Sequence, residues 1–161
     1  MEDLLLPIVL RALFLIHIGG AIVGFGPVFT FMILAGRANK AGPAGAAALL
    51  EGIVAIEHSI TVPVATFAQP LSGIGLIFLL GWSTDFFAHT WLWVALVIYV
   101  VAYYIAVFHQ TPTIARMAKL LKAGPPTPEF AVLAARASKG GPTITVLVAA
   151  MVVLMILKPG G

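Results

Sequence analysis

Four long apolar segments dominate this chain and restrict it to very few folds. They lie near residues 8–36, 53–81, 91–111 and 143–157. A helix needs about 20 mostly apolar residues to cross a hydrocarbon core about 30 Å thick. In lipid, only helices and closed barrels satisfy every backbone hydrogen bond. The sequence therefore predicts an all-α fold, a four-helix transmembrane bundle, in one integral membrane domain of residues 1–161.

The composition agrees with a membrane protein. Hydrophobic residues make up 61% of the 161 residues and charged residues 9%, whereas soluble domains have about half apolar and a quarter charged residues. The start, Met1-Glu2-Asp3, is acidic where a secretory signal would be basic, so we expect the first apolar segment to remain as a span. Cysteine is absent, which excludes disulfides, thiol chemistry and thiolate-ligated clusters.

The positions of the basic residues predict the orientation. Arg11 and Lys158 lie at the chain ends, and the other seven follow the first or the third span: Arg37, Lys40, Arg116, Lys119, Lys122, Arg136 and Lys139. By the positive-inside rule these two loops are cytoplasmic and both termini face outward across the inner cell membrane. Topology and anionic lipid headgroups explain this charge, so we expect the lipid bilayer as a partner and no nucleic acid.

Two short helices are expected beside the membrane on the cytoplasmic side. Residues 114–122 form an amphipathic stretch that we expect along the membrane surface, ending at Gly124-Pro125-Pro126. Thr127 and Pro128 then predict an N-cap and a first helical position. We expect Gly140-Gly141-Pro142 to end this second short helix and to begin the fourth span.

Three histidines, His17, His58 and His109, lie in or at the edges of the spans. An ionisable side chain at such depth is costly and usually marks a functional site. Small residues share the helical faces of these histidines, which predicts that all three point toward neighbouring helices. His89, in the outer loop, is expected in solvent. The small residues are Gly20 and Gly24 with His17, Thr61, Ala65 and Ser72 with His58, and Ala95, Ala102 and Ala106 with His109.

Depth suggests a haem site. His58 and His109 are expected roughly 9 to 12 Å from the midplane on the cytoplasmic side, and His17 roughly 8 Å to the other side. Two imidazoles at similar depth suit axial ligation of haem b, so this pair is the predicted metal-binding site. Arg37 and Arg116 lie just beyond it and could pair with the propionates. The predicted function is electron transfer, as a possible oxidoreductase component.

Each histidine also has a simpler explanation, which leaves a second class of function open. His58 could contact interfacial water, His109 could satisfy a backbone kinked by Pro112, and His17 could bond an interhelical carbonyl. The second class is a cofactor-free bundle that acts as a transporter, a proton relay or an assembly subunit. In that case His17 and Gln69 would line a polar cavity.

The run Leu15-Ile16-His17-Ile18-Gly19-Gly20-Ala21, followed by Gly26-Pro27, resembles the first span of small bacterial four-span proteins known only as predicted integral membrane proteins. More distantly it resembles CopD-like proteins and small membrane b-type cytochromes. The cytochrome resemblance implies haem held by span histidines and electron exchange with a quinone or another redox partner. This chain differs in having no histidine on the fourth span. A homo-oligomer is also compatible with the sequence.

Overall fold

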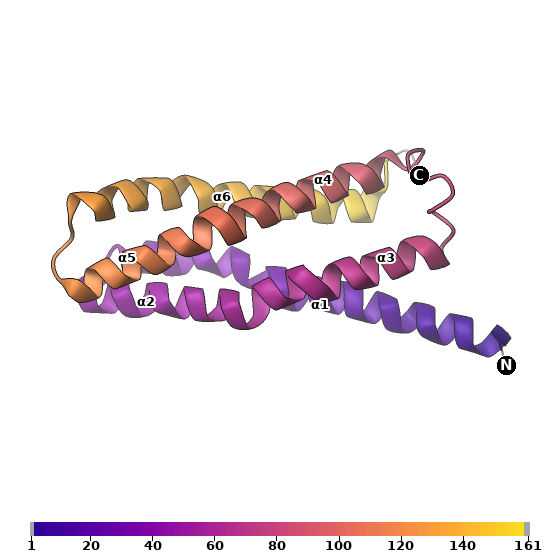
Figure 1. Cartoon of the computed structure of the whole chain (residues 1–161), viewed down its shortest axis with the longest axis horizontal. Helices are drawn as coiled ribbons and strands as arrows, with labels where there is room; N and C mark the ends of the chain where they lie inside the picture. The colour runs from indigo at the N-terminus through magenta and orange to yellow at the C-terminus, as the bar shows by residue number, and fades with distance from the viewer. Residues whose placement is uncertain (1, 160–161) are drawn as a thin grey trace.

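The computed structural model describes residues 2–159, with side chains from residue 5 onward. Within these residues it has no strands and consists of four long helices, each long and apolar enough to cross a membrane (Figure 1). The predicted four-helix fold is confirmed. The elements are α1 (Glu2–Ala38), α2 (Pro43–Ile56), the π-helical turns η1 (Glu57–Thr61) and η2 (Val64–Ala68), α3 (Gln69–Leu79), α4 (Thr90–Tyr104), the π-helical turn η3 (Ile105–Gln110), α5 (Thr111–Ala123) and α6 (Pro128–Leu157).

Several of these elements join end to end. The second long helix runs through α2, η1, η2 and α3, and the third runs through α4, η3 and α5. We call the end with the loops at 39–42 and 124–127 the basic end, and the opposite end, with both termini, the terminal end. Which end faces the cytoplasm remains a prediction. The long helices have 30 to 37 residues, or about 45–55 Å at 1.5 Å per residue, so they are longer than the hydrocarbon core is thick.

The two predicted surface helices are not separate, and this expectation was wrong. Residues 111–123 continue the third long helix as α5, whose apolar face packs against α2. Ile114, Met117 and Leu121 are buried there. This face is therefore covered by protein instead of lipid headgroups. Residues 140–142, expected to break the chain, lie inside α6.

Each proline inside the second and third long helices follows a π-helical turn. Pro63, Pro70 and Pro112 each come two residues after the last residue of η1, η2 or η3. A proline ring collides with the carbonyl four residues earlier in an α-helix, and the wider π turn changes this geometry. A π turn also adds a residue to the helix, so inward positions there recur every four residues. On the second long helix these buried residues are Glu57, Thr61, Ala65 and Gln69.

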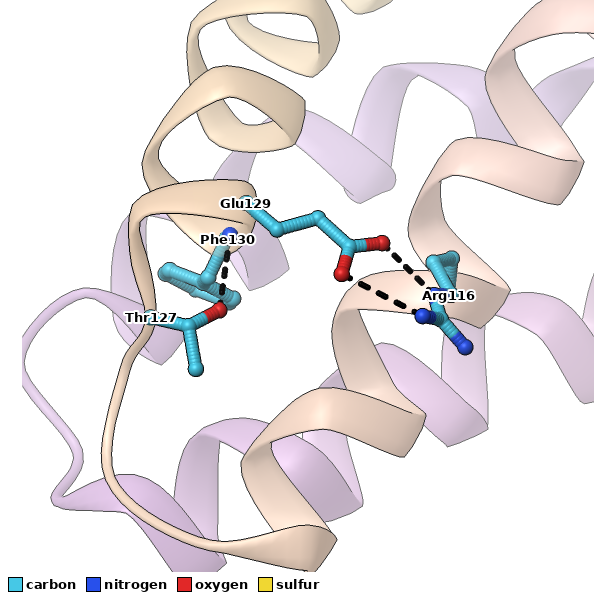
Figure 2. Close-up of polar contacts among 4 residues, drawn as sticks. All are labelled: Arg116, Thr127, Glu129 and Phe130. Carbon is cyan, nitrogen blue, oxygen red and sulfur yellow. Dashed lines mark hydrogen bonds and ion pairs between the residues drawn. The ribbon is translucent and has the colours of Figure 1, made fainter.

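Polar contacts join α5 to the start of α6 (Figure 2). The Thr127 hydroxyl accepts a hydrogen bond of 3.3 Å from the backbone N–H of Phe130, which confirms the predicted N-cap. Arg116 donates to both carboxylate oxygens of Glu129, at 2.8 Å from Nε and 3.2 Å from Nη2. Arg116, considered above for a haem propionate, is thus paired with a carboxylate of its own chain.

Candidate functional site

Buried polar side chains gather in the middle of the bundle, on the second and third long helices. A buried polar group normally has a hydrogen-bond partner, so the partner of each of these groups needs to be identified. The residues of this group, which we call the polar stripe, are Glu57, Thr61, Gln69 and Ser72 on the second long helix and Gln110, Thr111 and Thr113 on the third.

A cavity of about 890 Å³ lies between the long helices and leads from the basic end to the polar stripe. Along α2 its lining extends from Pro43 to Glu57, and along the third long helix from Leu121 to Gln110. Glu57 and Gln110 are therefore its deepest residues on these two helices. The separation of 14 positions from Pro43 to Glu57 corresponds to about 21 Å of helix. Apart from a few polar groups, the lining is apolar.

Glu57 is the most unusual member of the polar stripe. Only 6% of its surface is exposed, and its Oε2 atom has no hydrogen-bond partner among the described residues. The Thr111 hydroxyl lies beside the carboxyl group, and the nearby Thr61 hydroxyl is likewise buried without a partner in that part of the chain. An ionised carboxylate in such surroundings needs a cation or a proton as its partner.

A second, small cavity of about 40 Å³ continues from Glu57 toward the terminal end. This volume is large enough for a water molecule. Tyr99 and Tyr103 line it together with Thr61 and Thr111. The Tyr99 hydroxyl donates to the backbone carbonyl of Ala65, and the Tyr103 hydroxyl lies 3.0 Å from that of Thr66. The accessible lining of this small cavity is nevertheless almost entirely apolar, and both tyrosine hydroxyls are engaged with these partners.

His17 lies further toward the terminal end and faces the bundle, as predicted. Its Nδ1 is 3.0 Å from the Ser72 hydroxyl, and the Gln69 side chain donates to its backbone carbonyl at 2.8 Å. Ser72 also approaches the carbonyl of Ala68 at 2.5 Å. Because that carbonyl can only accept, Ser72 gives it the hydroxyl proton, and His17 Nδ1 is then the donor to Ser72. His17 and Gln69 therefore form one interhelical cluster.

His58 and His109 do not face neighbouring helices, so this expectation was wrong. Both side chains are exposed, while the adjacent residues Glu57 and Gln110 are buried. The cause is local, because His58 lies in η1 and His109 in η3. The extra residue of a π turn rotates the rest of the helix about its axis. A regular period of 3.6 residues therefore assigns the inward position to the histidine and not to the residue beside it. His109 instead packs against the Tyr104 ring, with centroids 5.1 Å apart.

The remaining predicted residues lie apart from the polar stripe. Arg37 is exposed in the last turn of α1. His89, expected in solvent, is half-buried near the rings of Trp82 and Trp91. Residues 2–159 hold no group of three or more His, Asp or Glu side chains that could bind a metal ion. Ligation of haem by two histidines does not require such a group, so the pairing of His58 and His109 remains a prediction.

Sequence reasoning missed Glu57 and Gln110 as site residues. In the sequence, Glu57 is a charged residue near the start of the second span, and Gln110 directly follows His109. The sequence does contain a signal for these two residues, because each lies two to six positions before a proline within a span. Gln110 precedes Pro112, and Glu57 precedes Pro63. Such prolines favour the π turns that direct these side chains inward.

The four long helices and the polar groups enclosed between them define an integral membrane protein. The chain belongs to the family described as predicted integral membrane protein (DUF2269), whose model matches residues 11–159. Comparison with curated proteins and with solved structures gives no match.

Proposed function

We propose that this protein conducts protons across the membrane and that Glu57 takes them up and releases them. The observation that supports this proposal is the Glu57 carboxyl, which is buried at the deep end of the large cavity with one oxygen lacking a partner among residues 5–159. A buried ionisable group within a membrane helix is by default a functional candidate, and chains of such groups serve as proton relays.

The groups beyond Glu57 suit a relay. The large cavity gives access from the basic end, and the small, mostly apolar cavity adjoins Glu57 on its other side. The cluster of His17, Ser72 and Gln69 follows toward the terminal end. Histidine and hydroxyl groups can each accept one proton and give up another. The relay requires that a proton leaving Glu57 crosses the apolar small cavity on a transient water molecule, because the lining of that cavity does not include His17, Gln69 or Ser72.

The test uses the purified full chain in liposomes that contain a pH-sensitive dye. Potassium and valinomycin impose a membrane potential, and we expect faster proton entry than in protein-free liposomes. Glu57→Gln should reduce the flux to the protein-free rate, because the amide cannot exchange a proton. Glu51→Gln is the matched control, since Glu51 is a carboxylate on α2 that is exposed and paired with Lys122. Wild-type flux equal to that of empty liposomes would overturn the proposal.

Haem b is the second candidate, supported by a single structural observation. Glu57 and Gln110 both line the large cavity, so the adjacent His58 and His109 lie near one level of the bundle. Because their side chains are exposed, a haem held by this pair would lie outside the cavity, with a quinone or another redox partner exchanging electrons. Protein from haem-replete cells should show a Soret band, with a low-spin spectrum lost in His58→Ala and His109→Ala and kept in His89→Ala. A colourless wild-type protein would exclude it.

A further inference from the structure

The large cavity has the size and lining of a ligand site. Sites for drug-sized molecules occupy about 300–1,000 Å³ and combine apolar walls with a few polar groups that fix orientation. The volume of about 890 Å³ falls within this range, and Ile53, Ile114 and Met117 are among the apolar residues of its wall. The cavity is larger than a path for protons needs.

The ionisable group at its deep end selects the charge of a ligand. Glu57 lines this end of the cavity, its Oε2 is buried without a partner in the described chain, and a carboxylate can only accept hydrogen bonds. Gln110 donates one of its two side-chain N–H groups to the carbonyl of Ala137, at 3.2 Å, and its oxygen lies against Gly140, so this amide does not select a charge. The carboxyl group of Glu57, the ionisable group at this end among the described residues, favours a cation and disfavours an anion.

The other titratable groups near this site do not change that preference. Among the described residues that line the large cavity, Lys40 is the other ionisable one, and it lies in the loop at the basic end. Pro43, at the start of α2, already lies about 21 Å along the helix from Glu57, so Lys40 is too far away to pair with the carboxylate. Tyr99 and Tyr103 also line the small cavity that adjoins Glu57, and both hydroxyls are engaged in hydrogen bonds.

We propose that the large cavity binds an apolar organic cation, with its positive centre at the Glu57 carboxylate. This inference rests on the proposed function in one respect, namely that Glu57 exchanges a proton. When the cation binds, the O–H bond of the neutral carboxyl group breaks, the proton leaves through the cavity to water, and the carboxylate pairs with the cation. Binding therefore releases one proton for each cation bound.

Tetraphenylphosphonium tests the inference, because its phenyl groups are apolar and its charge is positive. Tetraphenylborate has the same shape and the opposite charge. Binding to the purified full chain is measured by titration calorimetry in two buffers that differ in ionisation enthalpy. The difference between the two binding enthalpies gives the number of protons released. We expect saturable phosphonium binding with proton release, at least tenfold weaker in Glu57→Gln and unchanged in Glu51→Gln. Tetraphenylborate should bind equally weakly to all three proteins.

A second variant tests the same site in case Glu57→Gln does not fold. Ala134 lines the cavity on α6, and Ala134→Phe would fill part of it without changing Glu57, so phosphonium binding should again fall. Equal binding of the two ions, or binding unaffected by both substitutions, would overturn the inference. The two proposals fail separately. Proton flux without phosphonium binding would refute only the proposed cation site. Phosphonium binding that depends on Glu57, without proton flux, would refute only the proposed proton conduction.

Discussion

The two ends of the bundle are built differently. Toward the basic end, α2, α5, α1 and α6 pack around the large cavity and a compact apolar cluster. Toward the terminal end, the helices form two pairs, α1 with α3 and α4 with α6, which diverge in Figure 1. Ile53 of the basic-end cluster is 0% exposed, whereas Ile22 on α1 is 69% exposed.

This difference is what water around the basic end and lipid around the remaining length of the helices would produce. Lipid tails are as apolar as leucine, so a helix inside the bilayer loses little by leaving large apolar side chains uncovered. An apolar side chain next to water must be covered by protein, at a gain of roughly 25 cal/mol for each Å² buried. The covered cluster at the basic end and the bare faces of α1 follow from these two conditions.

The largest expected effect comes from the basic-end cluster. Ile53→Ala creates a cavity in a site with no exposed surface, and we expect a loss of about 2–5 kcal/mol in the free energy of unfolding. Ile22→Ala, at an exposed position, should change it far less. Denaturation in mixed micelles measures both. Equal losses of unfolding free energy in the two variants would contradict the proposed difference, because both ends would then depend on packing to the same degree.

The next effect concerns the closest approach of the first two long helices. A Cβ atom on Gly24 would lie 2.5 Å from Cγ1 and 2.9 Å from Cβ of Val64, so the helices must separate. We expect Gly24→Ala to cost about 1–3 kcal/mol. Gly19→Ala is the control, because its Cβ would meet no other described atom within 4 Å, and a helical alanine gains up to about 1 kcal/mol over glycine. Thermal unfolding that ranks Gly24→Ala above Gly19→Ala would contradict this close contact.

The smallest change in stability is expected at His17. His17→Leu loses the hydrogen bond to Ser72, worth about 1 kcal/mol, but keeps the backbone carbonyl that accepts from Gln69. Proton flux should nevertheless fall strongly, because the relay loses a group that exchanges protons. His58→Leu, at an exposed position, should leave both stability and flux unchanged. A His17→Leu protein that is markedly less stable yet conducts normally would show that His17 only joins two helices.

The four long helices were predictable from the sequence alone. Lengths and compositions of the apolar segments suffice for this, because each span satisfies its own backbone hydrogen bonds and needs no partner to form. The N-cap at Thr127 and the inward direction of His17 were also predictable, since the first depends on neighbouring residues and the second on one regular helical face.

Which polar residues share a site depends on how the helices pack. The π turns shift the inward position from His58 to Glu57 and from His109 to Gln110, and a fixed period of 3.6 residues cannot register that shift. Whether α5 lies on the membrane or continues the third long helix depends on whether α2 covers its apolar face. The large cavity likewise exists only where side chains from all four long helices meet without filling the space between them, and no single segment contains that information.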